Sequence, residues 1–259
     1  HNPMTNKIDQ IYKTSSAKPG GFIFDAHVVD VFADMISRSV PGYQQILEML
    51  PTLTRQFRSE NANYYDLGCS LGAGMLAMHE GLGQQQGALI GVDNSAAMIE
   101  QARVNLSPLS QKETAKPRVS GQENALTVRL LEQNLLEANI ENAAMVLMNF
   151  TLQFIPINKR DDIILAVYNG LNAGGAFVLS EKIKFDNRLT NQFLTDIHHQ
   201  YKADQGYSQL EIAQKRDAIE NVLIPETLSA HTNRLEKAGF RAITPWVQNL
   251  QFISILAIK

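Results

Sequence analysis

The stretch that decides the fold runs Tyr64-Tyr65-Asp66-Leu67-Gly68-Cys69-Ser70-Leu71-Gly72-Ala73-Gly74. An apolar run that ends in an acid is followed here by small residues, which let a backbone approach a ligand closely. The Gly-x-Gly-x-x-Gly pattern of dinucleotide-binding folds is absent because Ser70 takes the middle place, and this weakens a dinucleotide interpretation. We therefore expect a buried strand that ends in a ligand-binding turn.

Outward from this stretch, short apolar runs alternate with helical patterns. The runs expected as strands lie at 64–67, 88–92, 126–131, 144–150 and 176–179, and most are separated by helical patterns at 71–81, 95–106 and 159–171. This alternation predicts an α/β fold with a doubly wound, mostly parallel sheet. The last two runs, 240–247 and 250–258, lie close together in sequence and predict a C-terminal antiparallel hairpin.

The remaining segments define the expected domain organisation. Residues 1–21 are polar and predict a flexible N-terminal arm, in which Met4 has the position of a natural start and 1–3 precede it. Residues 22–259 are expected to form one domain, with N-terminal helices over 26–57 and a helical insertion at 187–221. The polar stretch 107–124, which contains Pro108, predicts a surface loop.

Composition excludes several classes of protein. The chain has 259 residues, a net charge of -3, 44% hydrophobic residues and one cysteine. One cysteine excludes an intrachain disulfide framework, and the slight acidity argues against a chain-wide basic footprint for nucleic acid. No apolar run approaches the roughly 20 residues of a membrane helix, and no secretory signal pattern is visible. We expect a cytoplasmic protein that binds neither membranes nor, stably, nucleic acids.

Polar residues follow the expected strands at the edge where parallel sheets bind ligands. Asp93 lies 25 residues after Gly68, near the spacing at which such folds place an acid against ribose hydroxyls. Asn134 and Asn149 follow the third and fourth strands. The combination resembles class I S-adenosylmethionine-dependent methyltransferases, and this resemblance implies a Rossmann-like fold and a nucleoside-sulfonium ligand.

A closer resemblance rests on more particular segments. These are Val40-Pro41-Gly42-Tyr43, 65–70, Asp93-Asn94-Ser95, 147–154, 179–182, Gly206-Tyr207-Ser208, Gln214-Lys215-Arg216 and Glu220-Asn221-Val222. Together they resemble the carboxy-S-adenosyl-L-methionine synthase family from about Gly21 to Lys259. The resemblance implies a homodimeric transferase that carboxylates S-adenosyl-L-methionine with prephenate as the carboxyl source, and releases phenylpyruvate. It also implies that the carboxylated ligand could copurify, and that a tRNA carboxymethyltransferase uses it to make 5-oxyacetyluridine at the wobble position.

The resemblance also implies roles for ten residues. Tyr43 would contact the ligand, Gly68, Cys69 and Ser70 would line its methionine end, and Asp93 and Asn94 would hold the ribose and adenine side. Asn134 and Leu135 would flank the adenine, Asn149 would lie near the sulfonium, and Arg216 would be the catalytic residue that binds the transferred carboxylate. Asn134 departs from the usual Asp of the family, which could alter the adenine contact.

The residues alone leave other interpretations open. An ordinary methyltransferase acting on a small molecule or an RNA base is the main alternative, and a non-catalytic adenosylmethionine-binding module is a third. Charge pattern alone would make Arg216 part of a solvated face, and Cys69 is expected to be a small packed residue. His198 and His199 diverge by about 100° on a helix, a poor spacing for one metal ion, so no metal site is expected.

Overall fold

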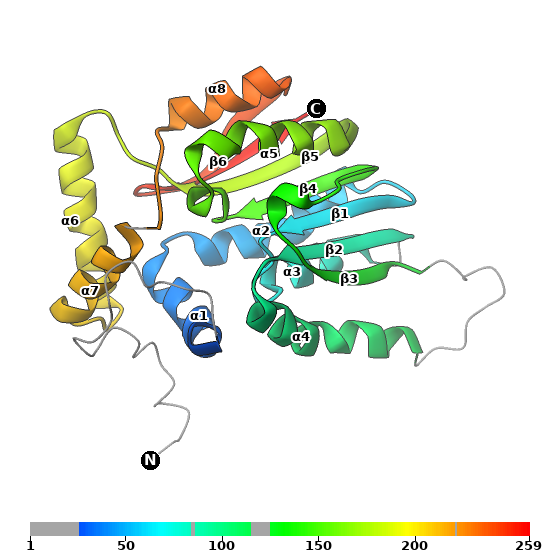
Figure 1. Ribbon diagram of the computed structural model, residues 1–259, viewed down its shortest axis with the longest axis horizontal. Coiled ribbons are helices and arrows are strands. Elements are labelled where there is room, and N and C mark those ends of the chain that lie inside the picture. The colour runs from blue at the N-terminus through cyan, green and yellow to red at the C-terminus, as the bar shows by residue number, and fades with distance from the viewer. Residues whose placement is uncertain (1–25, 84–85, 115–124, 221) are drawn as a thin grey trace, which may run out of the picture.

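The computed structural model describes residues 26–83, 86–114, 125–220 and 222–259 (Figure 1). The N-terminal arm expected at 1–21 lies outside these ranges. Within them, no helix combines the length and the apolarity that crossing a bilayer requires.

A seven-stranded sheet forms the centre of the described part, in the order β3-β2-β1-β4-β5-β7-β6. The five parallel strands are β1 (Ala62–Leu67), β2 (Gly87–Asp93), β3 (Thr127–Glu132), β4 (Ala143–Asn149) and β5 (Leu171–Lys182). The final hairpin, β6 (Ala242–Asn249) and β7 (Phe252–Ile258), is antiparallel, and β7 pairs with β5. The prediction of a doubly wound, mostly parallel sheet with a C-terminal hairpin is confirmed.

Helices cover both faces of the sheet. On one face α2 (Tyr43–Phe57), α3 (Ala73–Leu82) and α4 (Ala96–Thr114) pack through apolar side chains such as Leu50, Met78 and Ile99. On the other face α5 (Ile157–Gly170) and α8 (Leu228–Ala238) pack through Ile164 and Leu235. Two single-turn 3-10 helices, η2 (Leu135–Glu137) and η3 (Leu152–Phe154), follow β3 and β4. Because both faces of the sheet are buried, the parallel strands are continuous apolar runs in the sequence.

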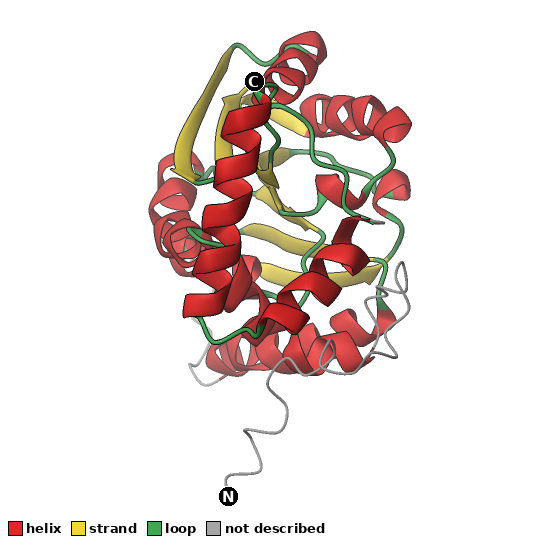
Figure 2. Ribbon diagram, turned by 90° about the vertical axis from the view of Figure 1, so that its left-hand side faces the viewer, coloured by secondary structure: helices red, strands yellow, loops and turns green. Residues whose placement is uncertain are grey.

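Three further helices gather at the end of the sheet toward which the parallel strands run (Figures 1 and 2). They are α1 (Ala26–Ser39), α6 (Arg188–Asp204) and α7 (Gln209–Glu220). The imidazole Nε2–H of His198 donates a hydrogen bond to the carbonyl oxygen of Ser39 at 2.6 Å, which joins α6 to the end of α1. The guanidinium of Arg38 lies 3.9 Å from the ring centre of Tyr207, in the connection between α6 and α7. The helical insertion is therefore fastened to the N-terminal helix.

One expectation needs correction, and one gains detail. The surface loop expected at 107–124 is wrong for its first part, because α4 continues to Thr114 with Pro108 inside it. Pro108 has no N–H for the carbonyl oxygen of Val104, and the hydroxyl of Ser107 donates to that oxygen instead at 2.7 Å. Residues 115–124 lie outside the described ranges. The helical segment expected at 187–221 is two helices, separated by a turn in which Gly206 has a φ of 97°.

Candidate functional site

A cavity of 810 Å³ lies at the carboxyl ends of the parallel strands. Strand order reverses between β1 and β4, and such switch points are where open α/β sheets bind ligands. The volume lies in the upper part of the usual range for small-molecule sites, roughly 300–1,000 Å³. Seven of the residues selected from the sequence line the cavity: Gly68, Ser70, Asp93, Asn94, Asn134, Leu135 and Asn149.

The turn after β1 is held against the end of β2. Gly68 has a φ of 83°, and a Cβ atom there would collide with the side chain of Thr151, so the position requires glycine. The backbone N–H of Ser70 donates to one carboxylate oxygen of Asp93 at 2.9 Å, and the N–H of Ser95 donates to the other at 2.9 Å. Asp93 therefore fixes both strand ends with one side chain.

Two buried acceptor atoms near this turn have no protein partner in the described part of the chain. They are Oδ1 of Asp66 and Oδ1 of Asn149. Burial, and to a smaller extent the charge of Asp93, raises the pKa of Asp66 to about 8. Burial also raises the pKa of Asp93, while hydrogen bonds from backbone N–H groups of Ser95, Ser70 and Asn94 lower it. Buried acceptors and a carboxyl group with a raised pKa suit a ligand that carries positive charge.

Of the other three selected residues, Tyr43 and Cys69 are not among the described residues that line the cavity. Tyr43 begins α2, and its ring centre lies 6.3 Å from that of Phe150. Burial, and then the charge of Asp66, raises the pKa of Tyr43 to about 12. Cys69 is buried and packs beside Gly91, as expected for a small residue under the turn. Arg216 belongs to α7, and its side chain lies outside the described residues.

The fold is shared with known S-adenosylmethionine-dependent methyltransferases, although no protein-family model matches the chain. A putative S-adenosyl-L-methionine-dependent methyltransferase of Methanococcus maripaludis superposes with a TM-score of 0.57 at 16% identity, covering 95% of this chain and 97% of that one. Human N-acetylserotonin methyltransferase gives a TM-score of 0.56 at 14% identity, covering 90% and 55%. At such identities the likeness shows the fold alone.

Sequence relatives decide the family. The carboxy-S-adenosyl-L-methionine synthase of Hahella chejuensis is 45% identical over 261 residues, covering 99% of this chain and all of that protein. The protein of the same name from Idiomarina loihiensis is 43% identical over 252 residues, covering 97% and 98%. The chain belongs to the carboxy-S-adenosyl-L-methionine synthase family. This confirms the resemblance found in the sequence, and the chain is thus an enzyme.

Asn134 has a local role that an aspartate would also fill. Its side-chain oxygen accepts a hydrogen bond from the backbone N–H of Leu136 at 3.0 Å and so caps η2. The residue is exposed at the mouth of the cavity. An aspartate at this position would preserve the cap, and would change only what the second side-chain atom presents to a ligand.

Sequence reasoning missed the wall of the cavity opposite these turns. Basic and aromatic-ring side chains from the end of β5 and from α6 line it: Lys182, Lys184, His198, His199 and Lys202. Burial lowers the pKa of His198 to about 3, and the charges of Lys202, Lys182 and His199 contribute, which shows that positive groups converge there. In the sequence, Lys182 stands out only as part of the segment 179–182 that resembles the family, and the spacing of the adjacent histidines argues against a shared metal without pointing to a cavity wall.

Proposed function

We propose that the protein transfers a carboxyl group from prephenate to S-adenosyl-L-methionine, giving carboxy-S-adenosyl-L-methionine and phenylpyruvate. Membership of the synthase family supports the product. The methyltransferase fold supports S-adenosyl-L-methionine as the molecule that occupies the strand-end turns.

One observation carries the proposal. A single cavity joins the strand-end turns around Gly68 and Asp93 to a wall that contains Lys182 and Lys202. Buried acceptors at the first end suit a cationic nucleoside, and the positive wall suits an acid. A site for two ligands of opposite charge is what carboxyl transfer between them requires, because both reacting carbons must be held in contact.

We assign the site residues accordingly. Gly68, Cys69 and Ser70 shape the methionine end, Asp93 and Asn94 hold the ribose and adenine side, and Asn134 and Leu135 flank the adenine. Tyr43 acts beside Asp66, Asn149 presents its oxygen near the sulfonium, and Arg216 binds the transferred carboxylate. An arginine suits the last role because its planar fork pairs with a carboxylate through two hydrogen bonds.

The chemistry balances without a further reactant. The sulfonium acidifies its methyl group, which loses a proton. Prephenate loses its ring carboxylate as carbon dioxide together with its ring hydroxyl as hydroxide, and its ring becomes aromatic. The deprotonated methyl carbon forms a bond to carbon dioxide, while the proton and the hydroxide leave as water. The enclosing helices α1 and α6 would keep bulk water from the trapped carbon dioxide.

Mass spectrometry of the purified protein with S-adenosyl-L-methionine and prephenate tests this function. We expect an adduct heavier by one carboxyl group, with phenylpyruvate in equal amount. Release of S-adenosylhomocysteine with an added acceptor, and no adduct, would favour an ordinary methyltransferase on a small molecule or RNA base. Binding without any product would favour a non-catalytic module. The intact mass of any copurified ligand gives a first indication.

The Arg216→Ala variant tests the assigned catalytic residue. We expect carboxylation to fall by about 100-fold or more, since a bidentate charged contact is lost, with binding of S-adenosyl-L-methionine largely retained. Arg55→Ala, an exposed change on α2, is the matched control and should leave turnover unchanged. Unchanged turnover in Arg216→Ala would remove this residue from the site.

We further propose that the protein acts in the cytoplasm as a homodimer of single-domain chains (22–259), and that a tRNA carboxymethyltransferase consumes its product. An apolar stripe on α6 supports the dimer: Leu189, Phe193 and Ile197 recur every four residues, with 73%, 45% and 47% of their surface exposed. Sedimentation of a Phe193→Glu variant tests it. We expect dissociation, and a wild-type enzyme that is monomeric while fully active would contradict the dimer.

A further inference from the structure

Gln153 occupies a position in the cavity wall that the assigned site does not use. It lies in η3, directly after β4, and only 6% of its surface is exposed. That small surface belongs to a residue that lines the cavity, next to the wall that contains Lys182. A glutamine so deeply buried is expected to have its polar groups matched by protein partners.

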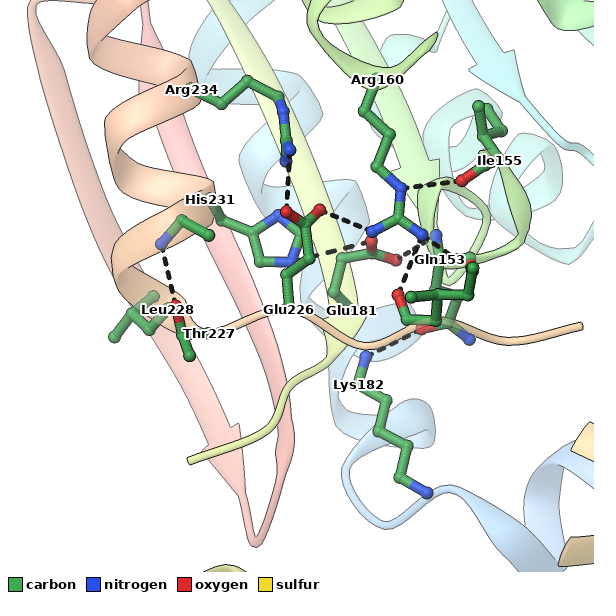
Figure 3. Close-up of polar contacts among 12 residues, drawn as sticks. Gln153, Ile155, Arg160, Glu181, Lys182, Glu226, Thr227, Leu228, His231 and Arg234 are labelled. Atoms are coloured by element: carbon green, nitrogen blue, oxygen red, sulfur yellow. Dashed lines mark hydrogen bonds and ion pairs between the residues drawn. The ribbon is translucent and has the colours of Figure 1, made fainter. Parts of the chain in front are cut away.

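Three of the four polar groups of Gln153 are matched (Figure 3). Its backbone N–H donates to the carboxyl group of Glu181 at 3.2 Å, and its backbone carbonyl accepts from Arg160 at 3.1 Å and from the N–H of Ile224 at 2.9 Å. Its side-chain oxygen accepts from the backbone N–H of Lys182 at 2.9 Å. The residue is therefore held from both the backbone and the side chain.

These contacts fix which way the side-chain amide points. The N–H of Lys182 can only donate, so the oxygen of the amide must face it, and the alternative orientation would oppose two donors. The amide nitrogen of Gln153, with its two protons, then remains without a hydrogen-bond partner among the described residues. The group left over is a pure donor at the cavity wall.

A buried clamp, formed by Arg160, Glu181 and Glu226, holds this arrangement in place. The side chain of Arg160 is fully buried and donates to the carboxylate of Glu226 at 2.6 Å and to the carbonyl oxygens of Ile155 and Ile224 at 2.8 and 2.9 Å. It thereby ties the loop after β4 to the segment after α7, and both line the cavity. Four of the five guanidinium N–H donors thus have acceptors among the described residues, which makes the clamp rigid.

We propose that Gln153 is a binding residue whose amide N–H₂ donates hydrogen bonds to an oxygen of the acid that supplies the carboxyl group, with Arg160 as its positioning residue. This inference rests on the proposed function. An amide donor adds directional recognition of a carboxylate or keto oxygen where lysines supply only charge. Its attachment to Lys182 places it on the basic side of the cavity.

Steady-state kinetics of Gln153→Glu and Gln153→Met, at saturating S-adenosyl-L-methionine, test the inference. Glu keeps the acceptor for Lys182 but replaces the donors with a negative oxygen, so we expect the KM for prephenate to rise by about tenfold or more. Met, of similar length, removes the donors without adding charge and should have a smaller effect in the same direction. The Kd of S-adenosyl-L-methionine should stay within about twofold of the wild type. Gln56→Glu, exposed on α2, is the control.

The Arg160→Lys and Arg234→Lys variants distinguish a role of Arg160 in positioning Gln153 from a role in stability alone. Both arginines bind Glu226, but only Arg160 reaches Gln153 and the cavity-lining backbone. We expect the lysine at 160 to raise the KM for prephenate, with kcat and the Kd of S-adenosyl-L-methionine changed less, and the lysine at 234 to leave the KM unchanged. An unchanged KM in folded Gln153→Glu and Gln153→Met, with active wild-type enzyme, would overturn the role of Gln153. An equal KM for prephenate in the two arginine variants would overturn the positioning role of Arg160.

If the variants do not fold, a measurement on the wild-type enzyme tests the role of Gln153 instead. The side-chain amide of Gln153 gives a nitrogen–proton signal in nuclear magnetic resonance. In protein saturated with S-adenosylhomocysteine, which cannot be carboxylated, prephenate should shift that signal, and absence of a shift at saturation would overturn the inference. Failure of the proposed function is recognised separately, because the wild-type enzyme itself would then form no carboxylated product.

Discussion

The two ends of the cavity are built in different ways. The strand-end turns consist of backbone held by a nearby acid: Gly68 and Ser70 follow one strand and Asp93 ends the next. The opposite wall consists of side chains from β5, α6 and the loop after β4, fastened by Arg160 from α5. The comparison teaches that a backbone site is stabilised by a few local hydrogen bonds, whereas a side-chain wall depends on buried charges brought from distant parts of the chain.

Arg160→Met should have the largest effect. It leaves the carboxylate of Glu226 with one cation fewer, removes the guanidinium donor from the carbonyl oxygens of Ile155 and Ile224, and leaves the carbonyl oxygen of Gln153 with one donor instead of two. Breaking a buried pair by removing one partner costs about 3–5 kcal/mol. We expect thermal denaturation to occur about 10 °C lower than in the wild type.

Arg234→Met is the matched control for that change. Arg234 binds the other oxygen of Glu226 at 2.9 Å, but also the exposed Asp161, and it reaches none of the three carbonyls. Its loss should lower the denaturation temperature by clearly less. Equal shifts in the two variants would mean that the wall depends on the charge of Glu226 alone and not on the backbone contacts of Arg160.

This difference explains how much the sequence could predict. A turn that must approach a ligand needs small residues and an acid at fixed offsets, so Gly68 and Asp93 could be recognised from spacing. Gln153 and Arg160 could not, because nothing in a helical or strand period marks the residue that will meet a buried carbonyl. The extension of α4 through Pro108 was missed for a similar reason: the compensating hydroxyl of Ser107 is visible only in three dimensions.

Asp93→Asn should have an intermediate effect, confined to the strand-end turns. An amide has one oxygen, so it can accept from the N–H of Ser70 or of Ser95 but not from both. Loss of a charged hydrogen bond predicts that the Kd of S-adenosyl-L-methionine rises by about 10- to 100-fold in calorimetry.

The KM for prephenate measures whether the two ends act independently. In Asp93→Asn it should change little at saturating S-adenosyl-L-methionine, because the opposite wall has its own supports. Asp186→Asn, an exposed change before α6, should alter neither constant. A rise in the KM for prephenate as large as the rise in Kd would show that the two ends are one coupled unit.

The smallest expected effect is on the pH dependence of stability, and it comes from one buried carboxyl group at each end of the cavity. Burial raises the pKa of Asp66 and of Glu181 to about 8, so at pH 7 the folded protein holds protons that the unfolded chain has released. The free energy of unfolding therefore falls as pH rises toward 8, by at most about 1.4 kcal/mol per pH unit for each group. The lowered pKa values of His198 and His231, about 3 and about 4, act in the opposite direction and only below about pH 6.5.

Chemical denaturation between pH 6.5 and 8 isolates the two carboxyl groups. Glu181→Gln and Asp66→Asn should each flatten the decline in stability by a similar amount in the free protein, because an amide cannot release the proton. Saturation with S-adenosyl-L-methionine should separate them: a cation beside Asp66 lowers its pKa, so Asp66→Asn then changes the slope little, while Glu181→Gln still does. Equal slopes for the two variants in the presence of the ligand would mean that its positive charge lies away from Asp66, and the assignment of the two ends would have to be reversed.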